Sequence, residues 1–205
     1  MNNIVLIGMP GCGKTTIVRE VARRKKMRFI DMDAYIVQMT GKSVQELFGE
    51  GEQVFRDAET EACKQLCQQE NCVIATGGGC VKRKENMRLL SENGTIIFID
   101  RPLERIISDV RCDTRPLLKN GAEGVRKLYK ERIGLYRKYA QITARNGRAF
   151  MRCVYYIIRR TSNENYGDVY KRQMLTGFIL MIIFIHIRMQ QILLTTYLMK
   201  NMVKG

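Results

Sequence analysis

Several signatures are missing from this 205-residue sequence, and each absence argues against a class of protein. No two of its seven cysteines form a Cys-x-x-Cys pair, which argues against a zinc ribbon, and their odd number argues against a disulfide framework. Neither a basic leader nor an apolar signal segment precedes the first apolar run, so we expect no export. Together these features favour a reducing, cytoplasmic location.

Four of the cysteines lie close together in the sequence, which raises the alternative of a metal site. They are Cys63, Cys67, Cys72 and Cys80. Because their spacing is irregular, we expect buried thiols and assign no metal to them.

The sequence also lacks an apolar run long enough to cross a bilayer. Residues 174–187 are nearly all apolar, but this run has fourteen residues before Arg188 interrupts it, and a spanning helix needs about 20. Just upstream, residues 168–173 back-translate as GAT GTG TAT AAG AGA CAG, which resembles the transposon-end adaptor of sequencing libraries. We therefore expect residues 161–205 to be an atypical tail that is not native, with a membrane anchor as the alternative.

The net charge of +15 is unevenly distributed along the chain. Residues 1–141 carry 25 Lys/Arg against 18 Asp/Glu, a balance of +7, and the remainder carries 10 against 2, a balance of +8. A moderate excess of this kind suits an enzyme that gathers phosphates and an anionic substrate. We therefore expect no nucleic-acid partner.

What the sequence does contain is a complete phosphate-binding loop. Residues 8–15 read Gly-Met-Pro-Gly-Cys-Gly-Lys-Thr, a match to GxxxxGK[ST], directly after the apolar run 4–7. In such a loop the backbone N–H groups surround an anion, Lys14 reaches the β- and γ-phosphates, and the Thr15 hydroxyl binds Mg²⁺. The predicted nucleotide-binding residues here are Gly11, Cys12, Gly13, Lys14, Thr15 and Thr16.

The sequence argues against a GTPase. The chain has no Asn-Lys-x-Asp element, and no Walker-B aspartate follows the apolar run 73–75. Apolar runs at 4–7, 28–30, 73–75 and 95–99 alternate with helical stretches, which is typical of a doubly wound α/β fold with a parallel sheet. Residues 141–147 are a weak further strand candidate, and 150–160 have the pattern of a helix.

Two segments interrupt this alternation. An insertion at 34–71 has helical periodicity, broken by Gly49 and Gly51, and is predicted to carry substrate. Residues 110–124, followed by a helix that begins near Val125, are predicted to form a lid.

Three groups of residues are candidates for substrate recognition. Gly77, Gly78 and Gly79 follow a predicted strand, at the edge where such sheets bind ligands. Asp31 and Asp33 are spaced so that both face the same way at a strand end, one for Mg²⁺ and one for a hydroxyl. The third group is the pair Arg56 and Glu59, for which a purely structural role is also possible.

Arg56 and Glu59 lie one helical turn apart, so the glutamate can orient the guanidinium toward a substrate carboxylate. The alternative is an ordinary surface ion pair, worth about 0.3 to 0.5 kcal/mol.

Seven motifs follow one another along about residues 1–140. They are the loop at 8–15, Asp31-x-Asp33, Thr40-Gly41-x-Ser43, Phe55-Arg56-x-x-Glu59, Thr76-Gly77-Gly78-Gly79, Arg115-Pro116-Leu117-Leu118 and Glu131-Arg132-x-x-Leu135-Tyr136. In this order and with these gaps, they resemble the motifs of the shikimate kinases. The resemblance implies a P-loop fold of the nucleoside-monophosphate-kinase type, with three layers and a five-stranded parallel sheet, over about residues 1–160. It also implies a monomer that transfers the γ-phosphate of ATP to the 3-hydroxyl of shikimate, in aromatic amino acid biosynthesis.

The resemblance further implies roles for single residues. Asp31 would lie near Mg²⁺ through water, and Asp33 would contact the reacting diol and accept its proton. Arg56 and Arg132 would hold the shikimate carboxylate, and Gly77–Gly79 would close on the ring through their backbone.

Two further roles fall on arginines around the predicted lid. Arg115 would act on the developing charge when the lid closes. Arg111 would stack on adenine, although the spacing leaves Arg105 as a competitor.

Two other functions are alternatives. Gluconate kinase and other small-molecule P-loop kinases share the phosphate loop and the lid, but not the Arg56–Glu59 pair with three glycines. A non-enzymatic basic P-loop protein with a membrane-attached tail would explain the charge, but not the arginines.

Overall fold

The structure is a computed structural model that describes residues 3–109, 121–147 and 150–162. The chain divides into one unit of residues 1–161 and a second of residues 162–205. The tail expected to be non-native therefore lies outside the described residues beyond position 162. Arg111 and Arg115 also lie outside them.

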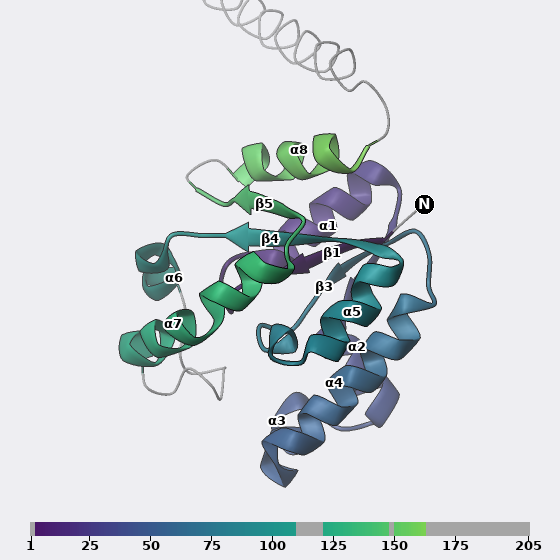
Figure 1. Ribbon diagram of the computed structural model, residues 1–205, viewed down its shortest axis with the longest axis vertical. Helices are drawn as coiled ribbons and strands as arrows, with labels where there is room; N and C mark the ends of the chain where they lie inside the picture. Colours follow the sequence, from purple (N-terminus) through teal and green to yellow (C-terminus); the bar gives the residue numbers. More distant parts are fainter. Residues whose placement is uncertain (1–2, 110–120, 148–149, 163–205) are drawn as a thin grey trace, which may run out of the picture. The chain divides into compact units, whose positions relative to one another are not determined.

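A parallel sheet runs through the first unit (Figure 1). Its five strands have the order β2-β3-β1-β4-β5 and every neighbouring pair is parallel. The strands are β1 (Asn3–Ile7), β2 (Arg28–Asp31), β3 (Cys72–Ala75), β4 (Gly94–Asp100) and β5 (Ile142–Arg145). Every residue of β1 and β3 is buried, as expected of inner parallel strands that are covered on both faces. The predicted α/β class is confirmed, and the weak strand candidate at 141–147 forms β5.

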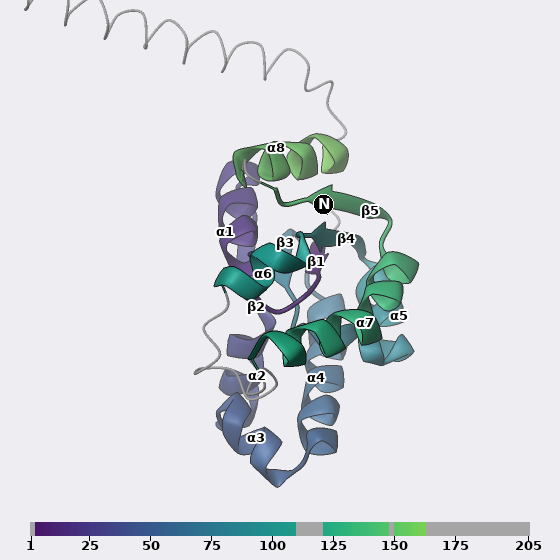
Figure 2. The same cartoon turned by 90° about the vertical axis from the view of Figure 1, so that its left-hand side faces the viewer.

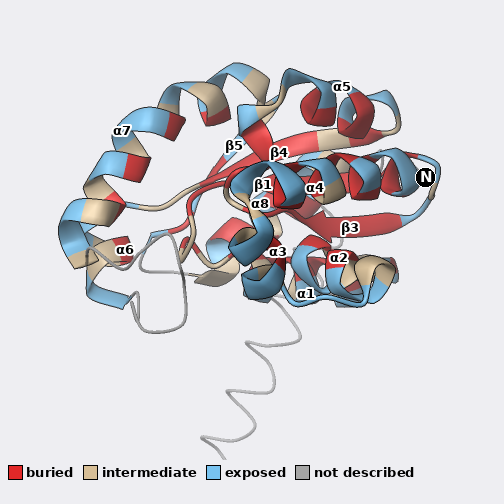
Figure 3. Ribbon diagram, turned by 90° about the horizontal axis from the view of Figure 1, so that it is seen from below, coloured by how far each residue is buried: buried red, intermediate tan, exposed pale blue. Residues whose placement is uncertain are grey.

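Helices cover both faces of the sheet, which gives three layers (Figure 2). On one face lie α1 (Lys14–Lys25) and α8 (Phe150–Thr161), and on the other α4 (Glu52–Cys67), α5 (Lys84–Glu92) and α7 (Gly121–Tyr139). Figure 3 shows that buried residues concentrate on the strands and on the inward faces of these helices. The helix predicted at 150–160 is confirmed as α8.

The insertion after β2 is formed by helices joined by short turns. It consists of α2 (Met32–Thr40), α3 (Val44–Glu50) and α4. Gly41 ends α2 with φ +70° and Gly51 separates α3 from α4 with φ +142°, backbone angles that favour glycine. The expectation that Gly49 also breaks the helical pattern is wrong, because α3 runs through it.

The predicted lid is also corrected at one end. Residues 121–124 belong to the first turn of α7, so this helix begins four residues before the expected Val125. Residues 110–120, the rest of the predicted lid, lie outside the described residues. Between β4 and that segment lies the short helix α6 (Leu103–Asp109), and between β3 and α5 the 3₁₀ turn η1 (Cys80–Lys82).

Two expectations from composition can be compared with the structure. Cys63, Cys67, Cys72 and Cys80 are all buried free thiols, as predicted. Within the described ranges, no helix combines the length and the apolar character needed to cross a membrane.

Candidate functional site

A cavity of about 620 Å³ lies where the segments that follow β1, β2 and β3 meet the insertion and α7. Most of the predicted site residues line it, although they come from segments far apart in the sequence. They are Gly11, Gly13, Lys14, Thr15, Thr16, Asp31, Asp33, Arg56, Gly77, Gly78, Gly79 and Arg132. Among the predicted residues that the structure describes, Cys12 and the adenine-site competitor Arg105 do not line the cavity. The Cys12 side chain is fully buried beside Gly8, and Arg105 lies in α6.

The phosphate loop forms one half of the cavity. Gly11 and Gly13 have φ values of +81° and +91°, and α1 begins directly afterwards at Lys14. The Lys14 Nζ donates to the carbonyl oxygens of Gly8 at 2.7 Å and Met9 at 3.0 Å. The ammonium group is therefore already held at the helix N-terminus, where an anion is favoured.

Thr15 and Asp31 meet beside this loop. The Thr15 hydroxyl donates to Asp31 Oδ2 at 3.1 Å, and Asp31 Oδ1 accepts from the backbone N–H groups of Asp33 and Ala34. A hydroxyl and a carboxylate side by side are the oxygen ligands that Mg²⁺ prefers, so the residues fit this ion.

The reason given for pairing Asp31 with Asp33 is wrong. Asp31 ends β2 and caps α2, whereas Asp33 lies in the first turn of that helix, so strand alternation does not relate their side chains. Both still line the cavity. Helix α2 begins at the carboxyl edge of the sheet, and this brings its first turn to the cavity.

The other half of the cavity contains a buried ion pair. Arg56 Nη1 lies 2.7 Å from Glu59 Oε2, and the two residues are 4% and 0% exposed. Arg56 also contacts the exposed Glu52 at 3.3 Å, and Lys82 reaches the same Glu52 oxygen at 3.1 Å. The alternative of a surface ion pair is therefore wrong.

Burial and pairing have opposite effects on these two groups. Burial raises the pKa of Glu59, and Arg56 only partly opposes that shift. Burial acts to lower the pKa of Arg56, but its contacts with Glu59 and Glu52 outweigh this and the pKa is raised. Arg56 thus stays a cation with a fixed orientation.

At Gly77 and Gly79, charged side chains lie so close to the backbone that a residue with a Cβ would collide with them. A Cβ at Gly77 would lie 2.9 Å from Glu59 Oε1, and one at Gly79 would lie 2.4 Å from Arg56 Nη2. A Cβ at Gly78 would lie 2.7 Å from the Pro10 ring of the phosphate loop. The three glycines therefore allow both halves of the cavity to approach this turn.

Arg132 completes this half of the cavity from α7. It is 1% exposed, and its Nε and Nη1 have no hydrogen-bond partner among the described residues. Glu131 Oε1 is 3.9 Å from Nε, too far for a hydrogen bond. A buried guanidinium with unpaired N–H groups is costly, and a planar carboxylate is the group that would satisfy it.

Several residues around the site were missed by the sequence analysis. Arg101 Nη1 donates to Gly11 O at 2.9 Å, and Asn146 Nδ2 donates to Cys12 O at 2.7 Å. The signal that could have found them is position, because each directly follows a strand at the ligand-binding edge of the sheet.

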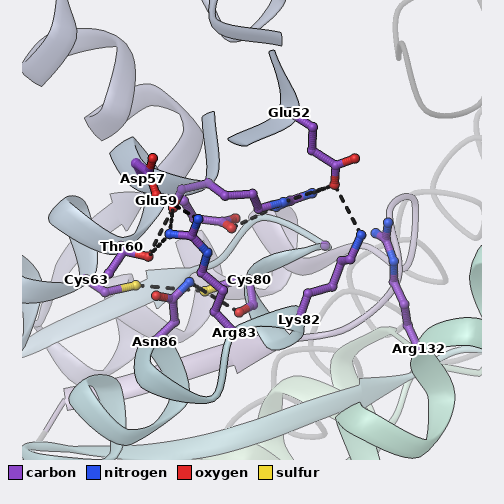
Figure 4. Close-up of polar contacts among 12 residues, drawn as sticks. Glu52, Asp57, Glu59, Thr60, Cys63, Cys80, Lys82, Arg83, Asn86 and Arg132 are labelled. Atoms are coloured by element: carbon purple, nitrogen blue, oxygen red, sulfur yellow. Dashed lines mark hydrogen bonds and ion pairs between the residues drawn. The ribbon is translucent and has the colours of Figure 1, made fainter. Parts of the chain in front are cut away.

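Two further residues, to which the sequence analysis gave no role, support the glycine turn and α4. The Tyr136 hydroxyl donates to Gly78 O at 2.5 Å. Arg83 donates to the carbonyl oxygen of Arg56 and to the Thr60 hydroxyl, each at 2.9 Å, and pairs with Asp57 at 2.7 Å (Figure 4). Arg83 therefore fixes the turn of α4 that carries Arg56.

Comparisons with known proteins agree with this arrangement. A sequence model of the family described as shikimate kinase matches residues 10–161. The chain belongs to the shikimate kinase family. The match ends at the last residue of α8, and within it fall the buried arginines and the three glycines.

Two shikimate kinases show how similar individual relatives are. The shikimate kinase of Clostridium botulinum (strain Alaska E43 / Type E3) is 54% identical over 137 residues, which cover 67% of this chain and 83% of that protein. That of Clostridium beijerinckii is 54% identical over 147 residues, which cover 72% and 87%.

Solved structures agree as well. The shikimate kinase from Acinetobacter baumannii, in complex with shikimate, superimposes with a TM-score of 0.74 and 33% identity over 78% of this chain and 92% of that one. The predicted shikimate kinase activity, a phosphotransferase activity of aromatic amino acid biosynthesis, is confirmed by family membership.

Proposed function

We propose that this shikimate kinase transfers the γ-phosphate of ATP to the 3-hydroxyl of shikimate, with the residue roles given below. The observation that carries the proposal is that a phosphate loop and two buried arginines line one cavity. A nucleotide polyphosphate requires the first feature, and a small acceptor with a carboxylate requires the second.

The phosphate-loop half would hold the nucleotide. Backbone N–H groups of Gly11 to Thr16 would surround the phosphates, and Lys14 would move from its carbonyl partners to the β- and γ-phosphates. Thr15, with Asp31 through water, would hold Mg²⁺. When bound, Mg²⁺ neutralises charge on the transferring phosphoryl group.

The other half would hold shikimate. Arg56 and Arg132 would pair with its carboxylate, which would satisfy the Arg132 N–H groups that have no partner among the described residues. Gly77 to Gly79 would contact the ring through their backbone. Asp33 would bind the diol and accept the proton of the reacting hydroxyl.

This division of labour suits phosphoryl transfer, in which positioning and charge neutralisation matter more than a strong base. Family resemblance supports two more assignments outside the described residues, Arg115 on the developing charge and Arg111 on adenine. It also supports a cytoplasmic monomer whose kinase domain ends near residue 160.

The deciding experiment is ADP release by the purified full-length chain with ATP and Mg²⁺, with shikimate or gluconate as the acceptor. We expect release that depends on shikimate. Release with gluconate alone would overturn the choice of acceptor, and no release with either would contradict the proposed reaction for this chain.

A further inference from the structure

The carboxamide of Asn146 packs against the phosphate loop from outside the cavity. Its Nδ2 donates to Cys12 O at 2.7 Å, and a Cβ at Gly13 would lie only 2.9 Å from the same nitrogen. Asn146 is 7% exposed and is not among the residues that line the cavity. Any effect it has on a ligand there must pass through the loop.

The position of Asn146 is fixed by the sheet. Its backbone N–H donates to Asp100 O at 2.8 Å, one step beyond the register in which Asp100 pairs with Arg145. The side chain therefore extends from the end of the β4–β5 ladder. A group on such a support can hold a loop in place with little loss of its own freedom.

The contact sets the direction of a backbone donor. In a trans peptide the C=O and the following N–H point in opposite directions, so holding Cys12 O toward Asn146 turns the Gly13 N–H the other way. Gly13 lines the cavity. Its N–H is thus one of the donors that the phosphate loop offers to an anion.

Arg101 holds the carbonyl of the preceding peptide, whose N–H, that of Cys12, donates to Met9 O at 3.2 Å within the loop. It follows β4, donates through Nη1 to Gly11 O at 2.9 Å, and is itself paired with Asp109 at the end of α6. Arg101 is also absent from the cavity lining. Two neighbouring peptides of the loop are therefore held from behind by side chains from two adjacent strands.

We propose that Asn146, assisted by Arg101, is a positioning residue that orients the phosphate loop for the polyphosphate chain of the nucleotide. The inference rests on the proposed use of ATP. It adds a prediction that the proposed reaction does not make. Asn146 should affect the binding of the phosphates and not the binding of the base.

Equilibrium binding of Mg·ATP and of Mg-bound inorganic tripolyphosphate, which has no base, tests this in the full-length chain. Loss of one buried hydrogen bond in Asn146→Ala should weaken both ligands about tenfold. The KM for shikimate should change less than about twofold. The half of the cavity that contains Arg56 and Arg132, the acceptor half, is not altered by this substitution.

A matched control is Asn3→Ala in β1. Asn3 is 2% exposed and donates to Gln69 O at 2.7 Å, and it also accepts from the Cys72 N–H. Its removal should lower the melting temperature at least as much as Asn146→Ala, with both ligands bound normally. If Asn146→Ala does not fold, Arg101→Met tests the same loop, since Arg101 is partly exposed. This variant should weaken the binding of both ligands about threefold.

Three results would overturn the inference. They are weaker binding of ATP with unchanged binding of tripolyphosphate, unchanged binding of both, and equal losses in Asn3→Ala. Failure of the unaltered chain to bind ATP would instead contradict the proposed function, so the two failures are distinguishable.

Discussion

The two halves of the cavity differ in how their charges are satisfied. In the phosphate half, Lys14 is bound by backbone carbonyls, and Thr15 is paired with Asp31. In the acceptor half, two N–H groups of Arg132 and Glu59 Oε1 are buried without a hydrogen-bond partner among the described residues.

The difference shows two ways to prepare an anion site. In the phosphate half, Lys14 and Thr15 have internal hydrogen bonds, so their polar groups are satisfied without a ligand. A ligand would replace these hydrogen bonds with its own. The acceptor half keeps out of water a guanidinium whose Nε and Nη1 have no hydrogen-bond partner among the described residues. This lowers the stability of the fold until a carboxylate pairs with these groups. Substitutions should therefore separate binding from stability in the acceptor half.

The largest expected effect is that of Arg132→Ala. Leaving the carboxylate half paired should raise the KM for shikimate by about 100-fold. The melting temperature should change little, because relief of the buried charge offsets the lost packing. Steady-state kinetics with either substrate varied, together with thermal unfolding, check both statements.

Arg137→Ala is the control for Arg132→Ala, since Arg137 is exposed on the same helix. We expect its shikimate KM within about twofold of that of the unaltered chain. A loss of ATP affinity in Arg132→Ala as large as the loss for shikimate would contradict the role of Arg132.

A smaller effect is expected from Gly79→Ala. The new Cβ would lie 2.4 Å from Arg56 Nη2, so the guanidinium must move, and the KM for shikimate should rise about tenfold. Gly49→Ala is the control, because nothing lies within 4 Å of a Cβ there. It should raise the free energy of unfolding by about 0.5 to 1 kcal/mol and leave both KM values unchanged. Equal kinetics in the two variants would show that Gly79 does not position Arg56.

The smallest effect is a pH dependence from Glu59, whose pKa burial raises above its usual 4.5. As the pH falls through this raised pKa, Arg56 loses the charge of its partner. The KM for shikimate should then rise, by at most about tenfold per pH unit for one ionisation. Glu59→Gln should abolish this pH dependence of the KM. The pH profile of Mg·ATP binding should be the same in Glu59→Gln and in the unaltered chain. A pH dependence that persists in Glu59→Gln would exclude Glu59 as its source.

The contribution of Glu59 to stability has the opposite sign. It is fully present below the unfolded pKa and is lost as the pH rises through the folded pKa, because the charged form is disfavoured by burial. Low pH should therefore favour this group in the fold while weakening shikimate binding.

The sequence predicted the phosphate half more completely than the acceptor half. Residues 8–15 are contiguous, so their backbone geometry and the roles of Lys14 and Thr15 follow from local conformation. Arg56 and Glu59 could be paired from helical spacing, but their burial could not be predicted because it depends on the glycine turn after β3 and on α5, which packs on α4. Strand reasoning for Asp33 failed since α2 begins one residue after Asp31.

The sequence by itself determined the alternation of strands and helices along the chain, the phosphate loop and the resemblance to the shikimate kinase family, because all three are encoded in short-range patterns. Only the tertiary structure decided that Arg132 would be buried with two N–H groups that have no partner in the described part of the chain, and that Asn146 would contact Cys12 across 134 positions of sequence. Both depend on which strand ends and helices lie side by side in the folded sheet, and no local propensity encodes that.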